Sequence, residues 1–161
     1  MTRTRTRTAL LLVLALVANG CAATGIAFRQ DDRLRFVSPD DRAEVTLPVR
    51  IEWSVEDFDV PSDGGFAVFV DRAPQPPGKT LEWLARDDDA CRPADGCPDA
   101  EWFAQRDVFP TTETSFTIER LPARSDDRRE FHEITVVLVD DDGRRIGETG
   151  WTLELQVARD E

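Results

Sequence analysis

The chain has few of the residues on which most catalytic and metal-binding sites depend. It contains one histidine, His132, and three cysteines among 161 residues. A Ser-His-Asp or Cys-His arrangement would have to use His132, and no Gly-x-Ser-x-Gly segment accompanies it. Zinc takes about four ligands. One histidine and the two cysteines other than Cys21 cannot supply that many. We therefore expect no enzyme, no bound metal and no cofactor.

The chain also lacks an apolar run long enough to cross a membrane. The stretch from Ala9 to Ala18 has ten apolar residues, too few to span roughly 30 Å of hydrocarbon as a helix. Arginine alternates with threonine before this stretch, and Asn19-Gly20 follows it. A charged start, a short apolar run and small residues are typical of a signal peptide, which we place at residues 1–20.

Cys21 directly follows this segment, which narrows the kind of signal. The letters LVANGC at residues 16–21 resemble the bacterial lipobox, whose usual form is Leu, a small residue, Gly or Ala, then Cys. The resemblance implies that Cys21 is diacylated and becomes the first residue of a membrane-anchored protein. Ala18 stands where Leu is usual and Asn19 where Ala or Ser is usual, so simple secretion stays open as an alternative.

The two remaining cysteines, Cys91 and Cys97, form an even pair. An even pair in an exported chain suggests a disulfide, because such bonds persist in oxidising compartments. Two free thiols are the alternative, and they are uncommon outside the cytoplasm.

The chain from Cys21 onward has little positive charge for its acidity. It holds 17 Lys and Arg against 32 Asp and Glu, a formal net charge of −15. This balance excludes nucleic acid as a partner, since nucleic-acid binding depends on neutralising phosphates. Residues 21–32 have no periodicity and are expected to form the lipidated cysteine and a tether.

One segment in the first half of the chain shows the clearest strand pattern. Every second residue from Val45 to Val55 is apolar, and the residues between are polar or proline. A period of two predicts a strand with one buried face and one exposed face. Pro48 cannot donate to a strand ladder, so we expect an edge strand at 44–47 and a central strand at 49–55.

The same alternation predicts the core. Ile51 and Trp53 should be buried while Arg50 and Glu52 face water, because a slip of one residue would expose the whole apolar face. We expect Trp151 in the core as well. The core partners of Ile51 and Trp53 should come from the last two strands: Val136, Leu138, Leu153 and Leu155.

Other short strands follow from the same patterns, with Asp142-Gly143 as a hairpin turn and a bulge at Gly147 and Gly150. The run 66–70 is apolar on both faces and should be a central strand. Phe109-Pro110 should end a short helix that is expected just before these two residues. Strands are expected at residues 34–37, 66–70, 81–84, 114–120, 133–139 and 146–157, and a short helix at 98–106.

The order of these strands resembles bacterial immunoglobulin-like or fibronectin type III-like extracellular domains. The resembling features are Val37-Ser38-Pro39-Asp40, the alternating strand after it, and the closing hairpin with its Asp-Gly turn. The resemblance covers residues 33–158 and implies an all-β, antiparallel two-sheet sandwich, with the short helix in a disulfide-bearing insertion. The inter-sheet cysteine pair of antibody domains is absent, because Cys91 and Cys97 are close in sequence.

Three aromatic residues flank the disulfide loop and form the candidate binding surface: Trp83, Trp102 and Phe103. Exposed aromatics can stack on sugars or anchor a protein partner. The alternative is that they pack the short helix onto an edge strand. His132 is expected at a strand start, partly exposed. Three acidic clusters (57/59/63, 87–89 and 140–142) do not match a calcium loop and are expected to be solvated turns, with calcium binding as the alternative.

The sequence therefore predicts a membrane-anchored, extracytoplasmic lipoprotein. Its expected role is a non-catalytic binding, adhesion or envelope-assembly module, with an envelope protein or a glycan as partner and the membrane reached through the lipid. The alternatives are a small hydrolase that uses two carboxylates and a carbohydrate-binding module that uses Trp83 and Trp102.

Overall fold

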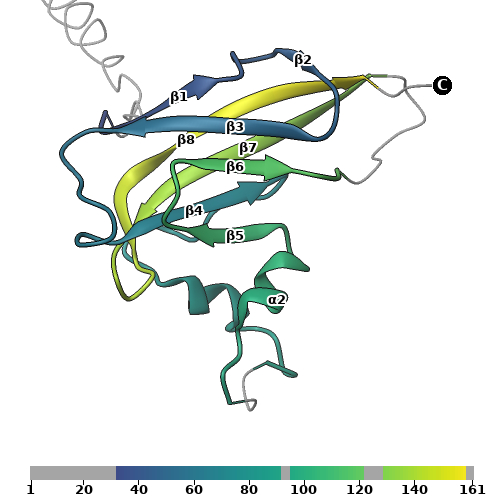
Figure 1. The fold of residues 1–161 in the computed structure, drawn as a ribbon. Helices are drawn as coiled ribbons and strands as arrows, with labels where there is room; N and C mark the ends of the chain where they lie inside the picture. Colours follow the sequence, from purple (N-terminus) through teal and green to yellow (C-terminus); the bar gives the residue numbers. More distant parts are fainter. Residues whose placement is uncertain (1–31, 92–94, 122–128, 159–161) are drawn as a thin grey trace, which may run out of the picture.

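The computed structural model describes residues 32–91, 95–121 and 129–158, so Cys21 and the expected signal and tether lie outside it. The described chain is mostly β-strand and forms two sheets (Figure 1). None of the helices in these ranges is long and apolar enough to cross a membrane. The strands are β1 (Leu34–Ser38), β2 (Glu44–Val45), β3 (Val49–Val55), β4 (Gly65–Val70), β5 (Val108–Thr111), β6 (Ser115–Ile118), β7 (Arg129–Val139) and β8 (Arg145–Ala158).

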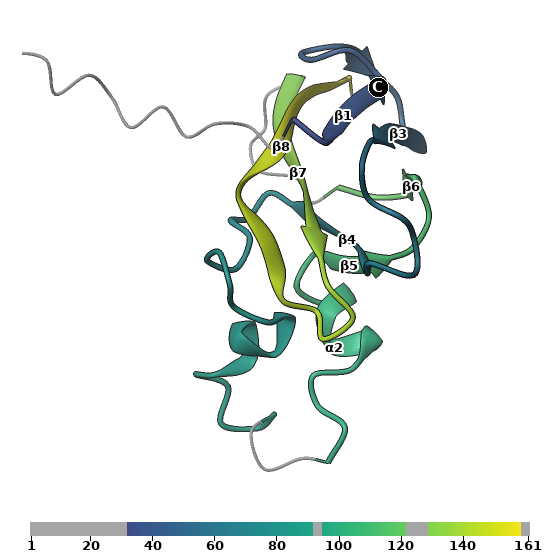
Figure 2. The ribbon, with the colours of Figure 1, turned by 90° about the vertical axis from the view of Figure 1, so that its left-hand side faces the viewer.

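Sheet A has the order β1-β3-β6, and sheet B has the order β2-β8-β7-β4-β5. Figure 2 shows β1, β3 and β6 on one side of the domain and β4, β7 and β8 on the other. The predicted break at Pro48 is confirmed, and the chain also changes sheets there. β2 lies in sheet B and pairs with β8 in parallel, so the expectation of wholly antiparallel sheets is wrong at this pair.

The predicted core is confirmed. Ile51 is fully buried and Trp53 is 3% exposed, and both lie in one cluster with Val136 and Leu153 of sheet B. Arg50, on the other face of β3, is exposed.

Strand β4 is central and apolar on both faces, as predicted. All of its residues are buried. Phe66, Val68 and Val70 face sheet A and join the first core. Ala67 and Phe69 point the opposite way into a second core, so sheet B is covered on its outer face too.

The chain between β4 and β5 supplies that cover. It contains the 3₁₀-helix η1 (Leu81–Ala85) and the α-helix α2 (Ala100–Ala104), and Figure 1 shows α2 next to β5. The strand expected at 81–84 is wrong. Trp83 N donates to Thr80 O over 3.1 Å, and this turn places Leu81 and Ala85 together in the second core.

Strand β5 was not predicted, because Phe109-Pro110 was expected only to end the short helix before it. Proline is tolerated on edge strands, and β5 is the edge of sheet B. Phe109 faces the first core, whereas Val108 faces the second core.

The closing hairpin has the predicted bulge. Val136 pairs with Trp151 and Leu138 pairs with Ile146, so the residues of β8 between these pairs bulge opposite Val137. Gly150 lies against β7, where an added Cβ would come within 2.7 Å of Val137 Cγ1. Trp151 is partly buried and packs against the first core.

Candidate functional site

The predicted disulfide is present in the chain that covers sheet B. Cys91 and Cys97 are bonded, with their Cα atoms 5.3 Å apart. Cys91 is 3% exposed and lies in the second core. The bond therefore joins the loop before α2 to the packed layer on sheet B.

The three candidate aromatic residues do not form one exposed patch. Trp102 is 9% exposed and Phe103 is 7% exposed, and both pack in the second core with residues of sheet B. Trp83 is partly exposed, and the guanidinium carbon of Arg86 lies 3.5 Å from the centroid of its ring system. Trp102 and Phe103 therefore pack the short helix against the domain, which was the alternative to an exposed binding surface.

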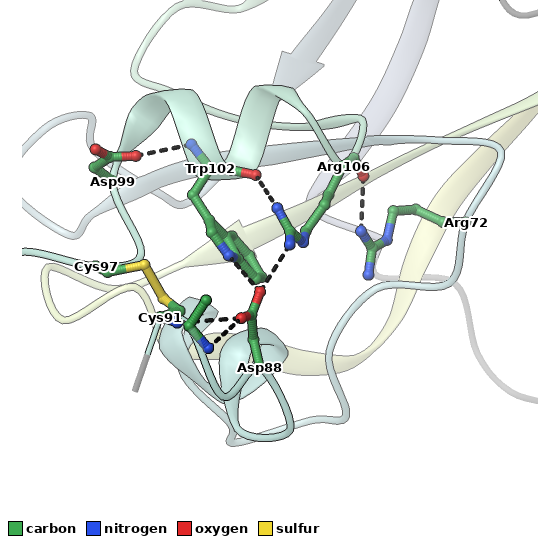
Figure 3. A network of polar contacts seen from close by, with 8 residues as sticks. Arg72, Asp88, Cys91, Cys97, Asp99, Trp102 and Arg106 are labelled. Carbon is green, nitrogen blue, oxygen red and sulfur yellow. Dashed lines mark hydrogen bonds and ion pairs between the residues drawn. A yellow bond between two sulfur atoms is a disulfide. The ribbon is translucent and has the colours of Figure 1, made fainter. Parts of the chain in front are cut away.

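Asp88 organises the polar contacts of this layer (Figure 3). Its Oδ2 accepts hydrogen bonds from Trp102 Nε1 at 2.9 Å and from Arg106 Nη2 at 2.7 Å. Its Oδ1 accepts from the backbone nitrogens of Ala90 and Cys91. The acidic run 87–89 was expected to be a solvated turn, but Asp88 instead links the disulfide loop to α2.

We expect acid to loosen this layer before the sheets unfold. The hydrogen bond from Trp102, followed by that from the Cys91 backbone, holds the pKa of Asp88 below its ordinary value of 3.8. A lowered pKa stabilises the fold above the ordinary value, and that contribution is lost as pH falls through the folded value. The Trp102 indole N–H resonance should therefore shift as pH falls below 3.8.

Asp88→Asn is the matched control for this titration. It should remove the low-pH shift of Trp102 while keeping a side-chain acceptor near the indole. The expectation is wrong if the Trp102 resonance titrates identically in both proteins.

Two arginines fix the start of the covering layer in place. Arg145 of β8 donates to Gln75 O over 2.8 Å and to Glu148 O over 3.0 Å, and burial lowers the pKa of its guanidinium. Arg72 donates to Arg106 O over 2.7 Å. The start of the layer is therefore fixed to sheet B and to the end of α2.

His132 is buried, contrary to the expectation of a partly exposed residue. It is 1% exposed and lies on the same face of β7 as Ile134 and Val136, toward sheet A. Strand β7 begins at Arg129, earlier than expected, and the alternation of the strand then turns His132 inward.

Two carboxylates face the His132 ring. Its Nδ1 lies 2.6 Å from Asp71 Oδ2, and its Nε2 lies 3.5 Å from Glu130 Oε2. The side chains of Asp71 and Glu130 are 6% and 4% exposed. Asp71 also accepts from Glu133 N over 2.9 Å. The contacts of this buried cluster connect the end of β4 to β7. Because all three side chains are sealed from solvent, the cluster is not accessible to a substrate.

The remaining acidic clusters stabilise their own turns. Asp63 accepts from Asp59 N, and Asp140 accepts from the backbone nitrogens of Asp142 and Arg144. In the part of the chain that the structure describes, no group of three or more His, Cys, Asp or Glu is arranged to hold a metal ion.

A cleft of about 590 Å³ lies between β5 and β6, within the size range of small ligand sites. Val70, Phe109, Phe116, Ile118 and Leu121 contribute apolar walls. The rings of Phe109 and Phe116 lie 4.6 Å apart between centroids. The polar lining residues are Asp107, Thr117, Glu119 and Arg120.

This cleft was not predicted from the sequence. Phe116 was expected within the strand at 114–120, and Phe109 was expected only to end the preceding helix together with Pro110. The two residues meet where β5, an edge strand of sheet B, lies next to β6, an edge strand of sheet A. No local sequence pattern signals that these two edges lie together.

Comparisons of the chain with protein-family models, with curated proteins and with solved structures found no match.

Proposed function

We propose that this chain is an exported, lipid-anchored protein whose two-sheet domain is an immunoglobulin-like, non-catalytic binding module on the extracytoplasmic side of the membrane. The disulfide between Cys91 and Cys97 is the structural observation that carries this proposal. Disulfides of this kind persist in exported proteins and are rare in the cytosol. The signal-like residues 1–20 and the lipobox-like cysteine give the route of export and the anchor.

The strand order supports the immunoglobulin-like assignment. Successive strands β3 and β4 lie in different sheets, as do β6 and β7. Such connections between two facing sheets are typical of Greek-key sandwiches. Fibronectin type III domains share this architecture, so the absence of an inter-sheet disulfide in the described residues does not count against it.

The geometry favours binding over catalysis. His132 is sealed between two carboxylates, whereas the 590 Å³ cleft has mainly apolar walls. Apolar walls with a few polar groups at the rim are typical of recognition sites. A sugar site built on Trp83 and Trp102 is less favoured, because Trp102 is buried.

The anchor is tested by replacing Cys21 with Ser. We expect the parent protein in the membrane fraction, and we expect Cys21→Ser in the soluble extracytoplasmic fraction, because the acyl chains provide the attachment. The control is the double variant Cys91→Ser with Cys97→Ser, which removes two other cysteines and should stay with the membrane. The anchor proposal is wrong if Cys21→Ser remains equally membrane-bound.

A further inference from the structure

Among the described strands, β6 has an unpaired edge toward the cleft. It pairs with β3 alone in this part of the chain, as the edge of sheet A. Trp53 N donates to Thr114 O over 3.0 Å, so that pair is hydrogen-bonded. Bonded pairs alternate along an antiparallel ladder. Phe116 therefore directs its backbone groups to β3, and Ser115 and Thr117 direct theirs to the free side.

The cleft runs along this edge. Its lining includes every residue from Phe116 to Leu121. Successive side chains of a strand point to opposite faces, so a pocket on one face alone would be lined by alternate residues. Lining by both Phe116 and Thr117 places the cleft beside the backbone of β6.

The outer edges of sheet B are less suited to accept another strand. β5 contains Pro110, which lacks an N–H donor. β2 has only two residues, too few for a useful ladder. The edge of β6 combines free backbone groups with an adjacent apolar cleft. That combination matches the binding of extended peptides by strand addition, in which the backbone gives affinity and a pocket gives specificity.

We propose that β6 binds an extended, basic segment of a partner protein as an added strand, with one apolar side chain of that segment in the cleft that Phe109 and Phe116 line. The inference rests on the proposed binding function and names its site and ligand class. Asp107 and Glu119 line the cleft together with one cation, Arg120. The chain from Cys21 onward has a formal net charge of −15, which attracts a basic partner and opposes pairing between two copies.

The test uses the full chain with its disulfide formed and a synthetic probe, Lys-Val-Lys-Leu-Lys-Val-Lys with blocked ends. We expect the probe to shift the amide resonances of Ser115, Thr117 and Glu119 and to slow hydrogen exchange at Thr117. A second probe carries N-methyl groups on alternate backbone nitrogens, and a third replaces each lysine with glutamate. Both of these probes should bind at least about tenfold more weakly than the lysine probe, a loss of about 1.4 kcal/mol. The N-methylated probe cannot complete the hydrogen-bond ladder with β6, and the glutamate probe is repelled by the acidic protein.

Protein variants separate edge binding from general charge attraction. Thr117→Pro removes an outward N–H at an edge position where proline is tolerated. It should weaken the binding of the lysine probe. Glu119→Lys should also weaken it by at least about threefold, the size of a surface charge effect. Glu82→Lys makes the same charge change at exposed Glu82 of η1, outside the cleft lining, and should have less than about a twofold effect. Unchanged chemical shifts of Ile51 and Val136 show that each variant is folded.

Three results would overturn the inference. They are no binding of the lysine probe at millimolar concentration, equal binding of the N-methylated probe, and protection of Thr117 in a dimer of this chain without any peptide. None of these results depends on Cys21, so membrane anchoring can fail or hold separately from the peptide site.

Discussion

Trp53→Ala is expected to lower the free energy of unfolding by about 3–5 kcal/mol. The Trp53 side chain is 3% exposed, and its ring system lies 5.4 Å from that of Phe66 in an edge-to-face contact between the two sheets. Its removal leaves a cavity at the centre of the first core. Trp53 Nε1 has no hydrogen-bond partner among the described residues, so the expected loss comes from packing. Urea unfolding measures it.

Glu52→Ala is the matched control at the next position of β3. Glu52 pairs with Arg50 over 2.8 Å, but the two side chains are 45% and 62% exposed. Exposed ion pairs contribute little, so the loss should be under about 0.5 kcal/mol. A loss as large as that of Trp53→Ala would mean that the two faces of β3 are assigned the wrong way round.

His132→Ala is expected to cost about 3–5 kcal/mol, because it leaves a ring-sized cavity and removes the contacts of the ring with two buried carboxylates. Asp71 and Glu130 would lose the ring that lies between them, with side chains only 6% and 4% exposed. The loss should appear in urea unfolding at neutral pH. Glu133, at the next position of β7, is exposed. Its replacement in Glu133→Ala should therefore cost under about 0.5 kcal/mol.

A triple variant distinguishes the loss of polar contacts from the cavity. His132→Leu combined with Asp71→Asn and Glu130→Gln replaces all three side chains together. It should be clearly more stable than His132→Ala, because replacing every member of a buried polar cluster costs less than removing one of them. A loss under about 1 kcal/mol for His132→Ala would show that the cluster contributes little to stability.

Features set by local alternation could be predicted from the sequence. The buried face of β3, the central position of β4 and the bulge in β8 all follow from patterns within one strand or one hairpin. A one-residue error would have moved Ile51 and Trp53 to the solvent face, so the hydrophobic pattern strongly restricts the register.

Features set by contacts between distant segments could not be predicted. The parallel pairing of β2 with β8 depends on the chain changing sheets at Pro48, and proline itself signals only a break. Leu81-Glu82-Trp83-Leu84 has an apolar pattern too short to separate a strand from a helical turn. The second core decides the outcome, because it takes up Leu81 and Ala85 together.

The candidate sites divide in the same way. The Cys91–Cys97 disulfide was predictable from the number of cysteines and the proposed export signal. The burial of His132 follows from the alternation of β7 once the strand is extended to Arg129, a signal that the sequence contains. The cleft beside β6 had no such signal, since it forms where the edges of two different sheets meet.

The mass of the intact protein isolated from membranes tests most directly whether this is a lipid-anchored, disulfide-bonded export product. We predict a chain that begins at Cys21, carries the added mass of a diacylglyceryl group, and gains one hydrogen on each sulfur when its Cys91–Cys97 disulfide is reduced. An unmodified chain that begins at Met1, or one with two thiols already free before reduction, would contradict the account.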